Sequence, residues 1–320
     1  MDKSEIGRYS DAISLFVSIV NAIKSKKLKL TDDLDKLVLK AGADKIAYVD
    51  NRSKAKGIWD LTKILPKGSK LITKEQVYSD SGNFPDFILK SLKIKKGFSG
   101  GAILELKDSK GSSIASFNST LPTKSKTLAE VDVINGSDFV SKIVKAVDKV
   151  DNEAYYKDYQ RPCLYLIRSG KNTSEVKLSL VDGAFFETLP KAELLHFMFM
   201  KILKDHIRIH HLKIADEEIT VFDKITKDLT DQTIIAQSQE IPNASIKPRL
   251  RIMSEANPEA NPHGKYYKTL IKSDSINLIL ENNDVTSKLV NVLKGKNMTI
   301  EKFKHKRDGD FILFEYLVRK

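Results

Sequence analysis

Two segments decide the fold: FPDFIL at residues 84–89 and GGAILELK at residues 100–107. The second segment has the length and apolar content of a buried strand. Side chains alternate along a strand, so Glu105 and Lys107 are expected on one face while the leucines beside them project into the core. The first segment is a short apolar element that can pair with this strand. Such pairing would bring Asp86 beside Glu105.

The surrounding sequence predicts further helices and strands. Ser10 is expected to cap a helix that runs to about Lys26, and Thr31 or Asp32 to begin a second helix that ends near Gly42. Strands are expected at residues 113–118, 163–167 and 176–181, and helices at 137–150 and 192–203. The strand at 113–118 is interpreted as a hairpin partner of the strand at 100–107. This order of helices, strands and a mixed remainder indicates an α/β (α+β) core.

Composition limits the class of protein. The chain has 320 residues, of which 41% are hydrophobic and 30% charged, and a formal net charge of +12. Such a positive excess favours a polyanionic partner, because Lys and Arg side chains bind phosphates and release counterions; the alternative is a solvated, lysine-rich surface. Cys163 is the only cysteine, which excludes an internal disulfide and a multi-cysteine zinc site. Without a membrane-length apolar stretch or a signal segment, we expect a cytoplasmic protein and no membrane partner.

The residues at 86, 105 and 107 have a chemistry of their own. Two carboxylates at one point repel each other unless a cation joins them, and Mg²⁺ binds through one or two carboxylates together with water and substrate phosphate. A metal at this point can activate water and stabilise the leaving oxygen. Lys107 can orient that water and neutralise charge that develops on the phosphate. Asp86, Glu105 and Lys107 are therefore sufficient for phosphodiester hydrolysis.

This pattern resembles the PD-(D/E)XK nuclease superfamily, of which the type II restriction endonucleases are the largest group. Pro85 and Asp86 match the Pro-Asp pair, and Glu105 and Lys107 match the acid and lysine of the (D/E)XK element; the resemblance covers about residues 80–120. It implies a restriction-endonuclease-like core with a mixed central sheet flanked by helices. In the family the Asp and Glu bind Mg²⁺ and the Lys serves the water.

The resemblance also implies an activity and partners. The expected reaction is Mg²⁺-dependent hydrolysis of sequence-specific double-stranded DNA, which leaves a 5′-phosphate and a 3′-hydroxyl. Such enzymes are often homodimers, because a two-fold protein matches a palindromic site. A cognate DNA methyltransferase is expected in the same system, although not as a bound partner.

Other residues are candidates for the same site. Members of the family often add an acidic residue from an N-terminal helix, for which Glu5 and Asp11 are candidates; Asp11 is better explained as a charge at a helix N-terminus. Contacts with DNA are expected from one residue near the next strand and from basic segments: Asn118, Lys124, Lys247, Arg249 and Arg251.

The chain is expected to divide near residue 190. Residues 1–190 would form the catalytic core with its helical lead-in, and residues 191–320 a region for DNA recognition and dimerisation. Two alternatives remain open. The protein can be a non-catalytic, basic nucleic-acid-binding protein in which Glu105 and Lys107 form a surface ion pair, or a repair or junction nuclease of the same superfamily.

Overall fold

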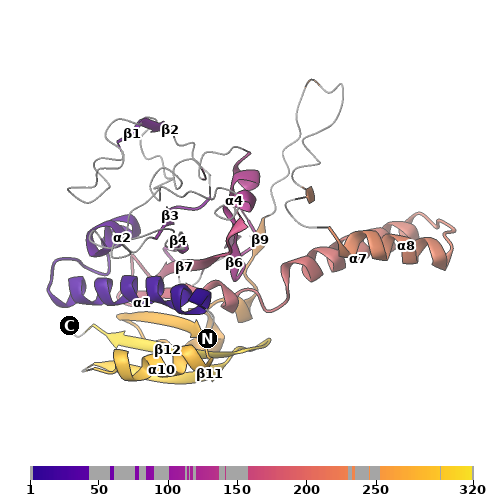
Figure 1. Ribbon diagram of the computed structural model, residues 1–320. Helices are drawn as coiled ribbons and strands as arrows, with labels where there is room; N and C mark the ends of the chain where they lie inside the picture. Colours follow the sequence, from indigo (N-terminus) through magenta and orange to yellow (C-terminus); the bar gives the residue numbers. More distant parts are fainter. Residues whose placement is uncertain are drawn as a thin grey trace.

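In the part of the chain that the structure describes, the protein is built around an eight-stranded mixed sheet with helices beside it (Figure 1). This architecture confirms the expected α/β class with a mixed central sheet flanked by helices. The computed structural model describes residues 3–42, 58–60, 76–78, 84–89, 101–111, 114, 116–117, 120–136, 141, 158–229, 233–234, 245, 253–295 and 297–318.

The strands of the main sheet come from distant parts of the chain. In spatial order they are β11 (Met298–Lys304), β12 (Asp310–Leu317), β10 (Ser275–Glu281), β8 (Lys177–Asp182), β7 (Arg161–Ser169), β4 (Ile103–Asp108) and β3 (Phe87–Ile88), and β6 (Ser125–Lys126) also pairs with β7. The β4–β7 and β8–β10 pairs are parallel and the other pairs are antiparallel. Two small sheets join β1 (Ile58–Asp60) to β2 (Gln76–Tyr78) and β5 (Ser116–Phe117) to β9 (Ser254–Glu255).

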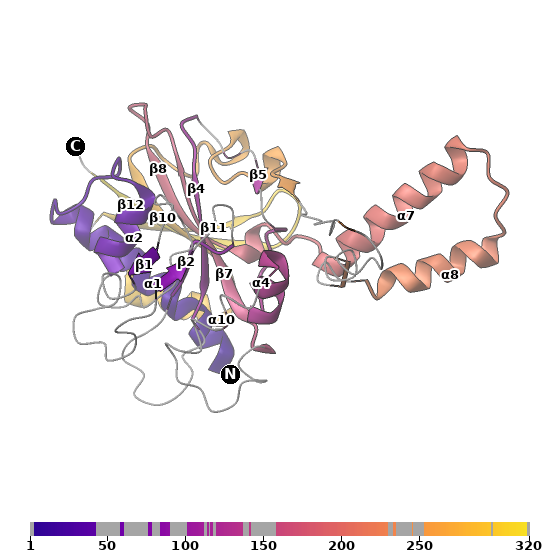
Figure 2. The same ribbon diagram turned by 90° about the horizontal axis from the view of Figure 1, so that it is seen from above.

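The helices fall into two groups. The first is close to the sheet: α1 (Lys3–Lys24) packs on β7, β8 and β10, α2 (Leu34–Gly42) on β4, and α10 (Asp284–Leu293) on α1. Helix α4 (Leu128–Asn135) lies in the connection from β4 to β7. The second group is a hairpin of α7 (Lys191–Ile209) and α8 (Asp216–Lys227), which projects away from the sheet (Figure 2). Three short 3-10 turns complete the description: η1 (Gly183–Phe185), η2 (Pro258–Ala260) and η3 (Lys265–Tyr267).

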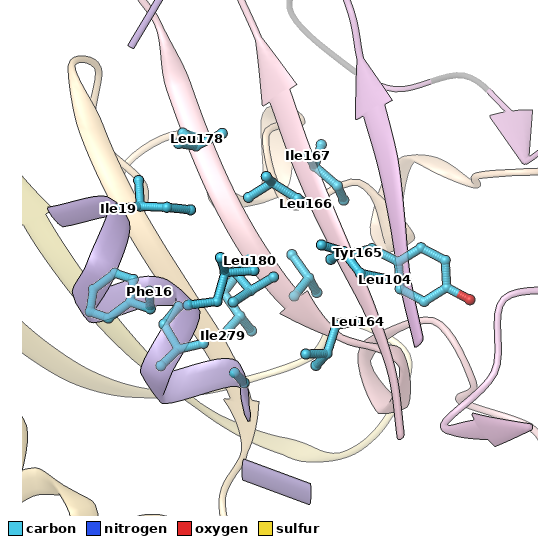
Figure 3. Packing of buried hydrophobic residues seen from close by; sticks show 14 of the residues in the cluster. Phe16, Ile19, Leu104, Leu164, Tyr165, Leu166, Ile167, Leu178, Leu180 and Ile279 are labelled. Atoms are coloured by element: carbon cyan, nitrogen blue, oxygen red, sulfur yellow. The ribbon is translucent and has the colours of Figure 1, made fainter. Parts of the chain in front are cut away.

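The core lies between α1 and the sheet. Phe16 and Ile19 of α1 face Leu178 and Leu180 of β8 (Figure 3), and all four side chains are buried. Apolar residues recur along both elements at the spacing that places them on this shared face. Tyr165 on β7 extends away from α1, towards the opposite face of the sheet. Its ring is buried there against Phe117 and Phe186, so this face of the sheet is also covered around Tyr165.

Some expected elements differ from the structure. Helix α1 begins at Lys3, so Ser10 is inside the helix and is not its cap. The segment at β5 is not a hairpin partner of β4, because it pairs with β9 while β4 lies between β3 and β7. Helix α7 extends to Ile209, beyond the expected end at residue 203. Except for Ser141, the helix expected at 137–150 lies outside the described residues.

The sheet also crosses the expected boundary at residue 190. Strands β10, β11 and β12 belong to the second part of the chain, yet they share one sheet with β4 and β7. Pairing of β10 with β8 joins the two parts directly. The division into residues 1–190 and 191–320 therefore does not coincide with a division of the sheet.

Candidate active site

Strand pairing brings Asp86 beside Glu105, as the sequence predicts. Phe87 pairs with Leu104 in the antiparallel β3–β4 ladder, so the preceding Asp86 lies opposite the following Glu105. The Asp86 Oδ2 atom accepts a hydrogen bond from the Leu106 backbone N–H at 2.8 Å. This contact fixes the Asp86 carboxylate against β4, next to the two charged side chains of that strand.

Glu105 and Lys107 form an ion pair on the surface of β4. The Lys107 Nζ atom lies 2.9 Å from Glu105 Oε1, and the two side chains are only 16% and 12% exposed. The other carboxylate oxygen, Glu105 Oε2, is buried and has no hydrogen-bond partner among the described residues. A buried, unpartnered carboxylate oxygen is costly, because the group has lost water without gaining a replacement. It is a position at which a cation or a water would be stabilised.

Aromatic side chains enclose this pair. Tyr165 is the register partner of Glu105 on β7, and its ring contacts Phe117 at 5.4 Å between centroids. Lys107 Nζ lies 5.5 Å from the centroid of the same Phe117 ring. Burial raises the pKa of Tyr165 well above its usual range, and the negative charge of Glu105 contributes to this increase. Glu105 and Lys107 are thus held in a partly dry environment in which electrostatic interactions are strong.

Asn135 at the end of α4 holds the segment that carries Asp86. Its Oδ1 accepts a hydrogen bond from the Phe84 N–H at 3.0 Å, and its Nδ2 donates one to the Phe84 carbonyl at 2.6 Å. Both contacts are buried. Asn135 therefore acts as a positioning residue for this site. Sequence reasoning missed it, because it is 51 residues from Phe84 and no local motif marks the pair.

Asp11 approaches the same strand at a different point. Its Oδ2 accepts a hydrogen bond at 2.9 Å from the N–H of Ala102, the residue immediately before β4. Burial raises the pKa of Asp11 to about 6, while this hydrogen bond and the charge of Arg161 oppose the increase. Asp11 is inside α1, so its interpretation as a charge at the helix N-terminus is wrong. Among the described residues, Asp11 is not part of a group of three or more side chains that could hold a metal.

The remaining candidates are only partly described. Lys124 is exposed, and its Nζ is paired with Glu281 Oε2 at 2.7 Å. It follows Thr123, whose N–H donates to the Tyr165 hydroxyl at 3.3 Å, so Lys124 is close to the aromatic wall of the site. The backbone of Glu5 lies in α1, but its side chain is outside the description. Four of the expected DNA contacts lie entirely outside the described residues: Asn118, Lys247, Arg249 and Arg251.

The donor set fits a magnesium ion bound mainly through water and substrate. Asp86 and Glu105 supply two carboxylates from adjacent strands, which is the number that Mg²⁺ commonly takes from a protein. The buried Glu105 Oε2 atom is consistent with a ligand position. Across the described ranges, no group of three or more His, Cys, Asp or Glu side chains is arranged to hold a metal. A site completed by protein ligands alone is therefore absent from this part of the chain.

Comparisons with known proteins leave the site to be interpreted on its own geometry. No family model, no curated protein and no solved structure matches this chain. Among the described helices, none has the length and apolar content to cross a membrane.

Proposed function

We propose that this protein is a Mg²⁺-dependent endonuclease of the PD-(D/E)XK type that hydrolyses double-stranded DNA, as type II restriction endonucleases do. One observation supports it most: the Asp86 carboxylate is fixed on the Leu106 N–H, beside Glu105 and Lys107. The strand pairing and this hydrogen bond place Asp86 on the strand that carries Glu105 and Lys107, and this juxtaposition supports the proposal.

The strand order around the site also supports this proposal. Strand β4 pairs antiparallel with β3, which follows the Pro-Asp pair, and parallel with β7. The connection from β4 to β7 passes through α4, and a crossover of this kind is needed to join parallel strands. Glu105 and Lys107 therefore lie on a strand that β7 holds along its length, next to the edge strand β3, and this pairing supports a fixed geometry of the charged groups.

Each residue has a distinct role in the proposed reaction. Asp86 and Glu105 would hold Mg²⁺, which supplies Lewis-acid activation of water and of the scissile phosphate when bound. Lys107 would orient the attacking water and donate a hydrogen bond to the phosphate oxygen as its negative charge grows. The Phe117 and Tyr165 rings exclude bulk water, so that these charges act in a medium of lower dielectric.

The non-catalytic alternative rests on the ion pair between Lys107 and Glu105. A purely structural ion pair would have the same 2.9 Å distance between Lys107 Nζ and Glu105 Oε1. In that case the positive charge of the chain would account for DNA binding, and Mg²⁺ would have no effect on it. Catalytic turnover separates these two functions. Repair and junction nucleases share the chemistry and differ in the DNA that they cut.

The α7–α8 hairpin supports a homodimer as the working form. A helix that is apolar on several sides is normally buried, yet α7 and α8 expose a set of large apolar side chains. These are Leu194, Phe197, Met198, Ile202 and Ile209 on α7, and Val221, Phe222 and Ile225 on α8. Buried His196 joins the helices, with Nδ1 at 2.9 Å from Thr226 Oγ1 and Nε2 at 3.2 Å from Asp223 Oδ1.

Charge makes a second copy of the hairpin the fitting partner. Helix α7 has four cationic and two acidic side chains, whereas α8 has four acidic and two cationic ones. Placing α7 of one copy along α8 of the other would pair opposite charges and cover the apolar side chains in a helical bundle. The hairpin lies apart from the candidate active site, so the bundle would leave that site accessible (Figure 2).

The nuclease proposal is tested by incubating unmodified phage DNA with the native protein and with Lys107→Ala, each with Mg²⁺ and with EDTA. Discrete fragments that require Mg²⁺ and disappear with the variant are the expected result. A smear of fragments that also requires Mg²⁺ and Lys107 would support a nuclease and contradict its sequence specificity. Intact DNA with both proteins, together with unchanged DNA binding, would contradict catalysis and favour the non-catalytic alternative.

A further inference from the structure

A cavity of about 750 Å³ opens beside the turn from β7 to β8. Ser169 at the end of β7 lines it, on the same sheet face as Lys107, since Lys107 pairs with Ile167 and alternate residues share a face. None of the three proposed catalytic residues lines this cavity. Its volume is in the range of pockets that hold small molecules.

Positive charge dominates the wall of the cavity. Lys177, Lys265 and Lys268 line it, and Glu175 is the one acidic residue in the lining that the structure describes. Lys177 is only 9% exposed, and within the described ranges neither a hydrogen bond nor an ion pair reaches its ammonium group. Its Nζ is not among the buried atoms that lack a partner, so the stem is buried while the ammonium reaches the solvent of the cavity. Burial lowers the pKa of Lys177 and the charge of Lys268 adds to this decrease, while Glu175 and Glu315 oppose it. An anion in the cavity would interact favourably with both ammonium groups.

The floor of the cavity is rigid and polar. The buried ring of His263 bridges two hydroxyls of the sheet, with Nδ1 at 2.8 Å from Ser169 Oγ and Nε2 at 2.8 Å from Ser179 Oγ. Asn261 donates a hydrogen bond to the Ile114 carbonyl at 3.1 Å and so fixes the adjoining loop. Because the imidazole is held at both nitrogens, it shapes the cavity and leaves the binding of an anion to the lysines.

Part of the cavity lining is apolar. Ile114, Ala256 and Pro258 contribute apolar side chains to it. A ligand that fills the whole volume must therefore carry both an anionic group and a less polar group. Inorganic phosphate would satisfy only the cationic part.

We propose that this cavity binds a phosphate-bearing small molecule of nucleotide size. Lys177 and Lys268 would contact the phosphate, and the apolar lining residues Ile114, Ala256 and Pro258 would pack against the organic part. Phosphate is favoured over a carboxylate because it has more acceptor oxygens for separate lysines and hydroxyl groups. This inference is independent of the proposed nuclease, since the site shares no residue with it.

The experiment is isothermal titration of the full-length protein with ATP, AMP and inorganic phosphate, in EDTA so that no divalent metal contributes. Variants are Lys177→Met, which keeps the aliphatic stem, and Lys268→Ala at the exposed rim. Lys288→Met on α10 is the control, because Lys288 is exposed and does not line the cavity. Thermal unfolding of each variant verifies that it folds.

We expect saturable binding of ATP that is weakened roughly 10-fold or more by Lys177→Met and by Lys268→Ala and unchanged by Lys288→Met, as the loss of one charged contact would give. Inorganic phosphate should bind more weakly than ATP.

Absence of saturable binding to ATP and AMP, or binding that all three variants retain equally, would overturn the proposal. A 12-base-pair duplex provides the last arm: if Lys177→Met weakens its binding while nucleotides do not bind, the lysines contact a DNA backbone and the small-molecule site is wrong. Should Lys177→Met fail to fold, Lys268→Ala carries the same test.

Discussion

The Asp86 carboxylate accepts a hydrogen bond from the Leu106 backbone N–H at 2.8 Å, which fixes the first residue of the candidate site to the strand that carries the other two. One oxygen of Asp86 therefore holds the strand pairing through this hydrogen bond, and the negative charge of the carboxylate remains available to bind a metal. Substitutions can separate the two, because an amide keeps the hydrogen-bond acceptor and removes the charge.

Asp86→Asn should fold with a stability close to that of the native protein and lose roughly 100-fold or more in cleavage rate, a loss of the size seen when one stabilising group is removed from an active site. Asp86→Ala should in addition lose about 1–3 kcal/mol of stability, because the Leu106 N–H loses its acceptor. Urea unfolding and a cleavage assay on the same samples measure both effects. Full activity of Asp86→Asn would show that the charge has no role.

Asn135→Ala tests how the Pro-Asp segment is held. The substitution removes both hydrogen bonds to the backbone of Phe84 and leaves buried groups unpaired. We expect a loss of about 2–3 kcal/mol in unfolding free energy, from two contacts of ordinary size. Cleavage should also fall in samples that remain folded, since Asp86 lies two residues beyond Phe84. Asn283→Ala, which removes the N-cap of α10 away from the candidate site, is the matched control for stability alone.

Asp11 should make the stability of the protein depend on pH. Its pKa is about 6 in the folded chain and 3.8 as the reference value, so the folded state binds a proton more tightly than the unfolded state. Its contribution is fully present below pH 3.8 and is lost as pH rises through 6. The shift corresponds to at most about 3 kcal/mol.

Urea unfolding between pH 4 and pH 7 measures this effect. The native protein should lose stability relative to Asp11→Asn as the pH rises across this range, because the amide does not ionise. A constant difference between the two proteins over the range would contradict the raised pKa of Asp11.

The α7–α8 hairpin should control the oligomeric state. Replacing both Phe197, which is 56% exposed, and Ile202, which is 58% exposed, by Glu places charges within the proposed bundle. The dimer dissociation constant should rise roughly 100-fold or more, since each lost apolar side chain contributes about 1.5–3 kcal/mol when buried. Light scattering over a concentration series measures this, with Lys288→Glu on α10 as the control. A native protein that remains monomeric at high concentration would exclude the bundle.

The centre of the site could be predicted from sequence because its information is local. The alternation in residues 100–107 places Glu105 and Lys107 on one face, and the apolar element at 84–89 is its nearest possible partner along the chain. The observed β3–β4 pairing confirms this expectation. The strands at Cys163 and Val181 were likewise marked by continuous apolar residues and a turn between them.

The rest depends on contacts between distant residues. Pairing of β10 with β8 joins residues about a hundred positions apart. No local sequence pattern specifies the partner with which a buried strand pairs. The pairing of Ser116 with Glu255 joins residues still further apart along the chain, and the sequence predicts a neighbouring hairpin in its place. The Asp11 contact with Ala102 arises from the packing of α1 on the sheet and has no signal in the helix itself.

The central claim is that Asp86, Glu105 and Lys107 catalyse phosphodiester hydrolysis with Mg²⁺. The most direct measurement is the rate of strand cleavage under enzyme excess, on a duplex containing the site mapped from phage fragments, for the native protein, Glu105→Gln and Glu301→Gln. Glu301 is an exposed glutamate on β11 and provides a matched control for the same chemical change. We predict Mg²⁺-dependent cleavage to a 5′-phosphate and a 3′-hydroxyl, reduced roughly 100-fold or more by Glu105→Gln and unchanged by Glu301→Gln. Equal rates for Glu105→Gln and the native protein, or no Mg²⁺-dependent cleavage of any DNA by the native protein, would contradict the account.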